Sequence, residues 1–325
     1  MAQTSRRKFI RVSDWHDFLT DIQHEGNPVN LYQLRQVCYK DIEAIRGRPL
    51  LVYAVKFPLP PLQPQIPINP PISIDLEDLD GFTDLVNSIA GKSDVDVLLH
   101  SPGGSPEATE RIVELLRTCF ESVSFLIPHS AYSAATMLAL SGDEIVLHQS
   151  ACLGPIDPQI NGIPARALKR GFEKAKKALK EEGPESLPAY VPLIEKYTLE
   201  LLEICEDYEQ LSQELVKAWL LRYMFKNDLS QVELIQDAVS FFSDYDTHRT
   251  HSRPLTFSKI KHLKLNIKLA EQELGDLLRE AHILLDGFFN VTSFVKVYEN
   301  SNGLSWGKQF QTIIQTPPPQ SNLPK

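Results

Sequence analysis

The sequence predicts an α/β fold built on a parallel β-sheet, with helices before and after it. The first observation is a strand, helix, strand pattern in residues 95–128, where a short apolar run is followed by a helical repeat and a second apolar run. The second is that further apolar strands, at residues 49–57 and 144–148, are separated from this unit by helical segments. Strands that alternate with helices favour a parallel sheet, because parallel neighbours need crossover connections.

The strand, helix, strand unit predicts that two loops meet at one edge of this sheet. Its first strand ends at the glycine turn SPGG, residues 101–104, and its second strand ends shortly before Ser133, which opens a helix. The carboxyl ends of parallel strands share one edge, and open α/β sheets bind ligands there. We therefore expect the glycine turn and Ser133 to lie close together.

The rest of the chain divides by composition around this unit. Residues 58–71 are so rich in proline that they can form neither a helix nor an inner strand, which predicts an extended loop. The expected organisation is an N-terminal helical lead-in, a catalytic core, a C-terminal helical region and a disordered tail, at residues 1–47, 48–225, 226–310 and 311–325.

Composition limits the kinds of partner that the protein can have. The net charge of -9 and the isoelectric point of about 5.5 argue against a nucleic-acid surface, which needs a basic stripe. The four cysteines have no metal-ligand spacing and need no disulfide framework, so we expect a reducing compartment and neither metal nor cofactor. No apolar run has the character of a signal peptide or a membrane span. These features predict a cytoplasmic protein.

Ser133 and the glycine turn also suggest a chemistry. A serine at the first turn of a helix has free N–H groups and the positive end of the helix dipole beside it, which stabilise a developing oxyanion. If the glycine turn directs N–H groups at the same point, the two turns meet the requirement for an oxyanion hole. Both features also have structural explanations, because serine caps helices well and glycine turns commonly follow strands. The residues alone leave both interpretations open.

Longer segments carry a resemblance to a known family. The segments HSPGGSPEATERIVELLR, AYSAATM, GDEIVLHQSACLGPIDPQI and ELVKAWLLRYMF resemble the SDH-type (serine dehydrogenase proteinase) family of Clp-fold serine proteinases. That family is related to signal peptide peptidase A and belongs to the Clp protease/crotonase superfamily. The resemblance covers residues 48–266, and it implies a Clp protease/crotonase-like fold, a homo-oligomer and serine endopeptidase activity on peptides or unfolded segments.

The resemblance also implies roles for individual residues. Ser133 would be the nucleophile, and the amides of Gly103 or Gly104, together with that of Ala134, would form the oxyanion hole. We further expect Ser105 and His129 to contact the substrate.

The general base is harder to assign. The Clp proteolytic subunit uses a histidine, but this chain has Asp157 in the corresponding GPIDPQ loop and no histidine there. Signal peptide peptidase A relatives use a lysine, and burial can lower a lysine pKa enough for it to act as a base. We expect Lys217, or otherwise Lys196, to be the base, although a surface position with the stem on apolar neighbours is the commoner case for such a lysine. His129 is left open as an alternative base. His248 and His251 have a spacing that would suit a metal site, but no third ligand is evident, so we interpret both as part of an ordered polar loop.

Two other functions stay open at this point. A protein of the same fold could hold extended peptides without cleaving them, as a scaffold. The oxyanion-hole donors could instead hold a thioester in crotonase-like acyl-CoA chemistry, although no basic cluster lies beside the glycine turn in the sequence. The sequence does not indicate a particular substrate or an ATPase partner.

Overall fold

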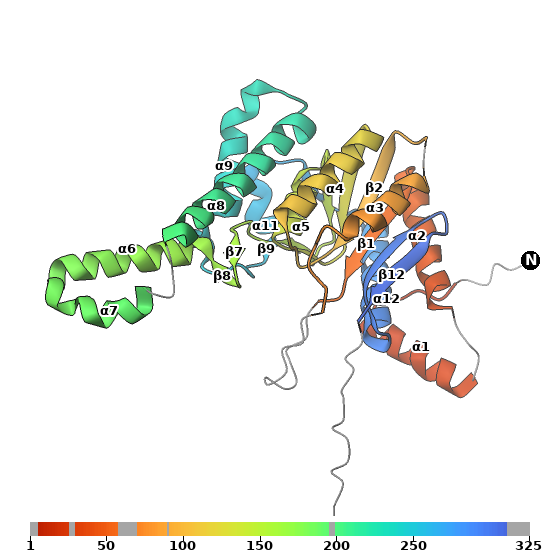
Figure 1. Cartoon of the computed structure of the whole chain (residues 1–325). Helices are drawn as coiled ribbons and strands as arrows, with labels where there is room; N and C mark the ends of the chain where they lie inside the picture. The colour runs from red at the N-terminus through yellow and green to blue at the C-terminus, as the bar shows by residue number, and fades with distance from the viewer. Residues whose placement is uncertain (1–5, 26–29, 58–69, 90, 195–198, 311–325) are drawn as a thin grey trace, which may run out of the picture.

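The computed structural model describes residues 6–25, 30–57, 70–89, 91–194 and 199–310. Within these ranges a seven-stranded sheet forms the centre of the molecule (Figure 1), in the order β10-β5-β3-β2-β1-β11-β12. Its strands are β1 (Leu50–Val55), β2 (Asp94–His100), β3 (Ser122–Ile127), β5 (Glu144–Leu147), β10 (Ile267–Leu269), β11 (Phe294–Asn300) and β12 (Ser305–Gln309).

The inner part of the sheet is parallel, as the sequence predicted. Strand β1 pairs in parallel with β2, β2 with β3, β3 with β5, and β5 with β10. Only β11 and β12 run antiparallel to their neighbours in the described sheet. The predicted α/β fold is therefore confirmed, and the carboxyl ends of β2 and β3 lie at one edge.

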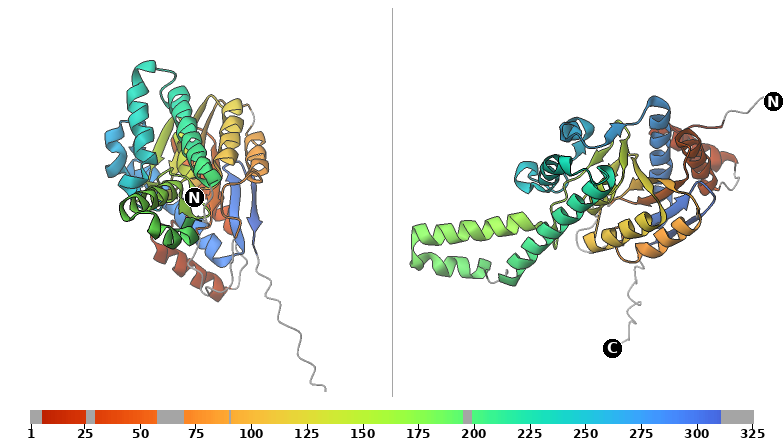
Figure 2. Two further views of the ribbon diagram at one scale, coloured as in Figure 1. Left: turned by 60° about the vertical axis from the view of Figure 1, so that its left-hand side comes forward. Right: turned by 90° about the horizontal axis from the view of Figure 1, so that it is seen from above.

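Helices cover both faces of the sheet, because successive side chains of each strand point to opposite sides. Leu51, Tyr53 and Val55 of β1 belong to one hydrophobic core, whereas the intervening residues of β1 belong to the other. The first core is covered by α3 (Asp78–Asn87), α4 (Pro106–Cys119), α5 (Ala134–Leu140) and part of α8 (Leu199–Trp219), and the second by α1 (Val12–Glu25), α2 (Leu31–Arg46) and α12 (Gln272–Val291) (Figure 2).

Residues 226–310, which we expected to be helical, also supply strands to the main sheet. Strands β10, β11 and β12 come from this region and form both of its edges. In β11, Lys296 and Glu299 are fully buried, and each pairs with an opposite charge, Asp78 or Arg35. Charged residues are rarely expected inside a core. The sequence of β11 therefore does not look like that of a buried strand.

The shorter elements surround the carboxyl edge of the sheet. Three short strands form a separate small sheet, β4 (Ser130–Ala131), β6 (Cys152–Leu153) and β9 (Leu255–Thr256), and β7 (Gln159–Ile160) pairs with β8 (Ile163–Pro164). The remaining short elements are the helices α9 (Val232–Ser243), α10 (Tyr245–His248) and α11 (Phe257–Ile260), a π-helical turn at Leu220–Met224, and 3₁₀ turns at Leu229–Gln231 and Lys261–Leu263.

A helical arm extends from the body of the protein. It consists of α6 (Ala165–Glu182), a 3₁₀ turn at Pro184–Ser186, α7 (Leu187–Ile194) and the adjoining part of α8 (Figures 1 and 2). Between helices α6 and α8 lies a small buried apolar cluster, formed by Ala165, Leu168 and Cys205, and Lys169 of α6 pairs with Glu209 of α8 at 3.0 Å. Over the described ranges, no helix combines the length and the apolar character needed to cross a membrane.

Candidate active site

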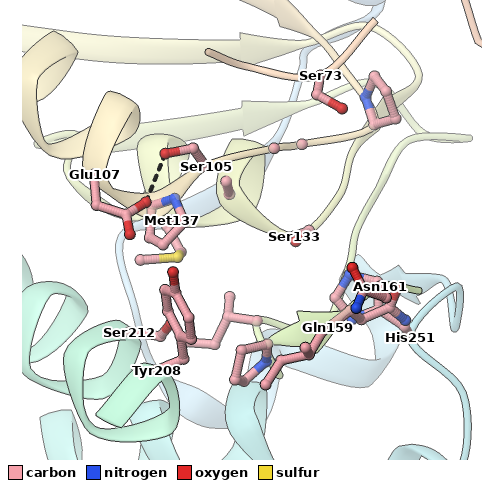
Figure 3. Close-up of a pocket in the computed structure, with 18 of the residues that line it drawn as sticks. Ser73, Ser105, Glu107, Ser133, Met137, Gln159, Asn161, Tyr208, Ser212 and His251 are labelled. Carbon is pink, nitrogen blue, oxygen red and sulfur yellow. Dashed lines mark hydrogen bonds between the residues drawn. The ribbon is translucent and has the colours of Figure 1, made fainter. Parts of the chain in front are cut away.

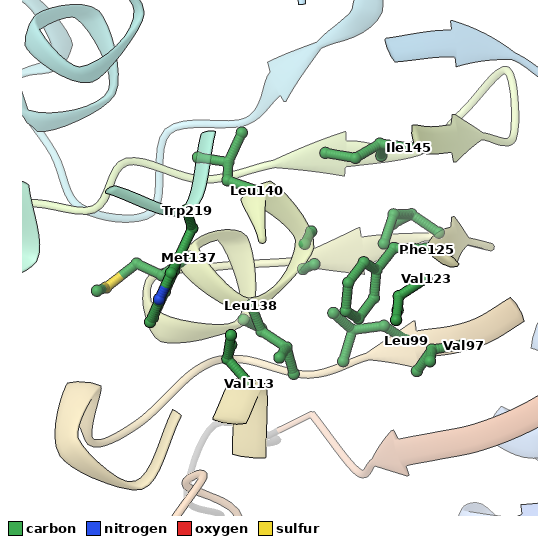
Figure 4. Close-up of a cluster of buried hydrophobic side chains, with 14 of the residues drawn as sticks. Val97, Leu99, Val113, Val123, Phe125, Met137, Leu138, Leu140, Ile145 and Trp219 are labelled. Carbon is green, nitrogen blue, oxygen red and sulfur yellow. The ribbon is translucent and has the colours of Figure 1, made fainter. Parts of the chain in front are cut away.

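Ser133 stands at the start of α5 in a conformation that is rare for a residue with a side chain. Its φ is 54° and its ψ is -124°, and its side chain forms no capping hydrogen bond with the helix. A positive φ at a non-glycine residue costs on the order of 1–3 kcal/mol and persists only where the surroundings impose it. All residues of α5 are buried, and Figure 4 shows Met137 and Leu138 packed among side chains of the sheet, α4 and Trp219. The packing of α5 therefore holds Ser133 in place.

The glycine turn lies directly against Ser133, as the sequence predicted. The ends of β2 and β3 are joined by hydrogen bonds, because Ser101 N–H donates to Ser130 O and Tyr132 N–H donates to Ser101 O. Gly103 has a φ of 101°, and a Cβ atom there would lie 2.5 Å from the Tyr132 carbonyl oxygen and 2.7 Å from the Ser133 Cβ. Only glycine fits this position.

Two backbone N–H groups beside Ser133 are free to bind a ligand. The Gly103 N–H donates to Ser101 Oγ at 3.2 Å. Among the described residues, the N–H groups of Gly104 and Ala134 have no hydrogen-bond partner. Ala134 is the first residue of α5, so its N–H also lies at the positive end of the helix dipole.

The outer side of the glycine turn is held by the segment before α3. Ile74 N–H donates to Gly103 O, and Ser105 N–H donates to Ile74 O, each at 2.8 Å. A Cβ at Gly104 would lie 2.3 Å from the backbone of Ile74. The buried Lys296 ammonium holds the same segment, because it donates to Ser73 O at 2.6 Å and to Asp78 at 2.8 Å.

Ser133 lines a cavity of about 550 Å³ at the carboxyl edge of the sheet (Figure 3). The cavity lies between the glycine turn, the start of α4, α8 and the β7–β8 hairpin. Its lining comprises Ile72, Ser73, Pro102, Gly103, Gly104, Ser105, Pro106, Glu107, Ser133, Ala134, Met137, Ile156, Pro158, Gln159, Ile160, Asn161, Tyr208, Ser212 and His251. A cavity of this volume can hold a few side chains of a bound peptide, or one small organic ligand.

One imidazole lines this cavity, and a buried carboxylate supports it. His251 lies in the loop between α10 and β9, and its Nδ1 is 3.0 Å from Asp157 Oδ1. Asp157 is 3% exposed, and its Oδ2 has no hydrogen-bond partner among the described residues. No hydrogen bond joins His251 to Ser133 in this structure. His251 nevertheless lines the same cavity as Ser133.

The structure does not bring Lys217, the preferred candidate for the base, to Ser133. Lys217 is exposed on α8 and donates to Gln236 Oε1 at 3.0 Å, outside the cavity. Lys196 lies outside the described residues. Ser105 does line the cavity, but its hydroxyl also caps α4 by accepting from Ala108 N–H at 3.0 Å.

His129 lies outside the cavity lining, in a cluster of imidazoles beneath α12. Its ring stacks on His282 with the ring centroids 4.4 Å apart, and His100 lies 5.8 Å from His129 and 5.2 Å from His282. Burial lowers the pKa of His100 to about 3 and that of His282 to about 2, and it also lowers the pKa of His129. The described residues contain no group of three or more potential ligands arranged to hold a metal ion.

Sequence reasoning missed the pairing of His251 with Asp157. The GPIDPQ loop drew attention to Asp157, but its partner is 94 residues away along the chain. His251 precedes β9, and β9 pairs with β6 just before that loop. Only a prediction of the β6–β9 pairing could have indicated that His251 lies next to Asp157.

The chain is similar to known proteins at the level of a family. The model of the family described as ClpP-like SDH-type serine proteinase matches residues 65–279. Two uncharacterized proteins of the archaeon Methanocaldococcus jannaschii are similar to this chain. One is 26% identical over 194 residues, which make up 60% of this chain and 59% of that protein. The other is 30% identical over 101 residues, 31% of this chain and 35% of that protein.

The chain therefore spans less than two thirds of the length of either relative. The family match is broader, since it includes the glycine turn, Ser133, the Asp157 loop and His251. Together with the mostly parallel sheet, this match assigns the protein: the chain belongs to the family of ClpP-like SDH-type serine proteinases.

Proposed function

We propose that this protein is a serine peptidase that cleaves peptides or unfolded segments, with Ser133 as the nucleophile. The observation that carries the proposal is the strained Ser133, held against a glycine turn at the wall of a cavity. A nucleophile on a sharp turn at a helix start presents its hydroxyl to the substrate beside free N–H groups.

The oxyanion hole in this proposal is formed by the N–H groups of Gly104 and Ala134. These groups have no partner among the described residues, whereas the Gly103 N–H is already bonded to Ser101 Oγ. Gly104 is thus the preferred donor of the two glycines considered from the sequence. Loss of one such donor typically slows acyl transfer by about 10²–10³-fold.

We assign the general base to His251, oriented by Asp157. Its Nδ1 faces the carboxylate, which leaves Nε2 to accept the proton of the Ser133 hydroxyl. The absence of a direct Ser133–His251 hydrogen bond in the ligand-free protein does not oppose this role, because catalytic hydrogen bonds often tighten only when substrate binds. The alternative is a Ser-Lys pair, for which Lys196 is the candidate that the described residues leave open.

The proposed reaction has two stages. Ser133 Oγ attacks the scissile carbonyl carbon while His251 takes its proton, and the two N–H groups stabilise the oxyanion. The C–N bond then breaks, and the leaving amine takes the proton from His251. A water molecule hydrolyses the resulting ester by the same steps and releases Ser133.

Acyl-CoA chemistry receives less support from the cavity. Its described lining residues include no lysine or arginine, and phosphate groups of a nucleotide would need such partners. A non-catalytic scaffold of the same fold would bind peptides whether or not Ser133 carries its hydroxyl. Peptide hydrolysis by variants therefore separates these functions.

The test is hydrolysis of fluorescently labelled casein by the wild type and a set of variants. We expect Ser133→Ala to reduce the rate to the uncatalysed background, and His251→Ala to reduce it by about 10²–10⁴-fold. Asp157→Asn should reduce it less, because the imidazole remains but loses its orienting carboxylate.

Two variants serve as controls. Ser130→Ala removes a buried hydroxyl that bonds His129, and Lys217→Ala removes the exposed lysine; both should retain nearly full activity. Full activity of Ser133→Ala would rule out the proposed nucleophile. If His251→Ala is fully active and Lys196→Ala is inactive, the general base is Lys196 and not His251.

A further inference from the structure

We propose that the cavity selects a lysine or arginine side chain on the amino side of the scissile bond, and that Glu107 binds its cationic group. This inference rests on the proposed peptidase function and names the substrate class for the same site. It depends on where Glu107 lies, on the charge of the cavity and on the shape of the path from Ser133 to Glu107.

Glu107 occupies one end of the cavity. It belongs to the first turn of α4, directly after the glycine turn that contacts Ser133. Figure 3 shows Glu107, Met137 and Tyr208 on one side of Ser133, whereas Gln159 and His251 lie on the other. The substrate residue that carries the scissile carbonyl can point its side chain away from His251. That side chain would then extend toward Glu107.

The charge of the cavity favours a cation at this end. Glu107 is the only Asp, Glu, Lys or Arg among the described lining residues, so no fixed cation of the lining neutralises it. Its Oε2 accepts a hydrogen bond from Ser105 Oγ at 2.6 Å, and its Oε1 has no partner among the described residues. Oε1 is therefore available to an incoming ammonium or guanidinium group.

The start of α4 would by itself attract an anion, because the helix dipole is positive there. Glu107 already supplies the negative charge that this end of the helix favours. An acidic substrate side chain at the same place would meet the carboxylate, and like charges at short distance repel. The cavity is thus expected to disfavour glutamate where it favours lysine.

The path toward Glu107 suits a long aliphatic stem. Met137 and the ring of Tyr208 lie on the same side of Ser133 as Glu107 (Figure 3), and Pro106 also lines the cavity. Lysine and arginine bury their methylene stems on apolar surfaces while the charged group reaches a polar partner. The Tyr208 ring can also contact the cation through its face.

The experiment compares fluorogenic peptides that differ only in the residue before the scissile bond, which is lysine, arginine, leucine or glutamate. We expect the full-length wild type to cleave the lysine and arginine peptides with a kcat/KM about fivefold or more above the leucine peptide, and the glutamate peptide least. Glu107→Gln, which keeps the hydrogen bond to Ser105 but loses the charge, should abolish the difference between lysine and leucine. Glu107→Lys should invert the preference between lysine and glutamate.

Glu110→Gln is the matched control, because Glu110 lies on the same helix but does not line the cavity. It should retain the wild-type preference. Equal cleavage of the four peptides, or an unchanged preference in Glu107→Gln, would overturn the inference while leaving the peptidase function intact.

A binding measurement keeps this test separate from catalysis. Fluorescence anisotropy with the Ser133→Ala variant should show tighter binding of the lysine peptide than of the leucine peptide, and the added Glu107→Gln change should remove the difference. If the wild type neither cleaves peptides nor reacts with a fluorophosphonate, the peptidase function fails. Selective binding would then still support the Glu107 subsite, and unselective binding would overturn it.

Discussion

The ends of β2 and β3 lead into two sites of opposite character. On one side, the segments after these strands form the cavity of Ser133, with free N–H groups and a strained residue at its wall. On the other side, the last residue of β2, His100, meets His129 and His282 in a buried cluster under α12. Both sites use residues that are close together in the sequence, yet the first lines a cavity, whereas the imidazoles of the second pack against one another.

The comparison shows that burial, and not residue type, separates the two sites. Histidine is the side chain most often associated with proton transfer near neutral pH. In the cluster, however, burial keeps the imidazoles of His100 and His282 neutral, and the Nδ1 atoms of both have no hydrogen-bond partner among the described residues. His251 has instead a carboxylate partner and access to the cavity. Chemistry is therefore expected on the side of Ser133 and packing on the side of the cluster.

The largest effect should follow from closing the cavity at Gly103. In Gly103→Ala, the new methyl group would overlap Tyr132 O and Ser133, and the residue would remain at a positive φ. We expect hydrolysis to fall by about 10²–10³-fold, because the oxyanion donors move, and stability to fall by roughly 1–3 kcal/mol or more from strain. Peptide hydrolysis and urea unfolding measure the two effects.

Gly91→Ala is the control for this prediction. Gly91 also has a positive φ, of 85°, but a Cβ there would meet no atom within 4 Å. The Gly91→Ala protein should lose some stability and keep its activity. An active Gly103→Ala protein would show that the contact between the glycine turn and Ser133 does not matter for catalysis.

The next effect concerns the outer support of the cavity. Lys296→Met leaves the buried Asp78 without its nearest cation, although Tyr53 and Tyr298 still donate to it and Lys308 lies 3.8 Å away. Removal of one partner of a buried ion pair costs about 3–5 kcal/mol, so we expect a loss of that order in urea unfolding. Reaction of Ser133 with a fluorophosphonate should also slow, because Lys296 no longer holds Ser73.

Lys308→Met on the adjacent strand β12 provides the comparison. Lys308 pairs with the exposed Glu77 at 3.0 Å and lies farther from Asp78 than Lys296 does, at 3.8 Å instead of 2.8 Å. We therefore expect its removal to cost less than that of Lys296, closer to the roughly 0–1 kcal/mol typical of exposed pairs. A stability loss in Lys296→Met no greater than that in Lys308→Met would argue against the buried ion pair as the support of this wall.

The last effect concerns the histidine cluster, which we expect to make the protein labile to acid while leaving it unchanged at neutral pH. The pKa of His100 falls from 6.5 to about 3 on folding, because burial disfavours its charged form. The unfolded chain thus binds more protons than the folded chain between these pH values, and stability must fall as the pH is lowered through this window. The slope can reach about 1.4 kcal/mol per pH unit for each such histidine.

Thermal or urea unfolding at a series of pH values from 7 to 4 checks this expectation. His282→Phe retains a flat ring against His129 but removes one titrating group, so it should flatten the slope. Phe57→Leu removes the ring stacked on His100 without removing a titrating group, so it should lower stability equally at every pH. A wild-type stability that is constant over this range would contradict the neutral, buried state of the cluster.

Local patterns predicted much of the fold. Helix α4 is the crossover expected between the two strands of residues 95–128, and it begins where Ser105 caps it and Pro106 occupies its first turn. The contact between the glycine turn and Ser133 followed from the parallel pairing of β2 and β3. Structural features that depend on residues adjacent in the sequence, or on one helix that joins two parallel strands, could be predicted.

Features that depend on distant segments could not be predicted. Strand β11 carries charges whose partners, such as Asp78, lie more than two hundred residues away. His251 meets Asp157 only because β9 pairs with β6. Lys217 has apolar neighbours in the sequence, but its own position on α8 faces solvent. The expected homo-oligomer stays a prediction, and the proline-rich loop and the tail lie outside the described residues.

The central claim is that Ser133 is an activated nucleophile, and covalent labelling tests it most directly. The full-length protein is incubated with a fluorophosphonate, and the modified residue is identified by mass spectrometry of its peptides. We predict a single phosphonylated residue, Ser133, no labelling of Ser133→Ala, and much slower labelling of His251→Ala. Absence of labelling in the wild type, or equal labelling of Ser133→Ala, would contradict the proposed active site.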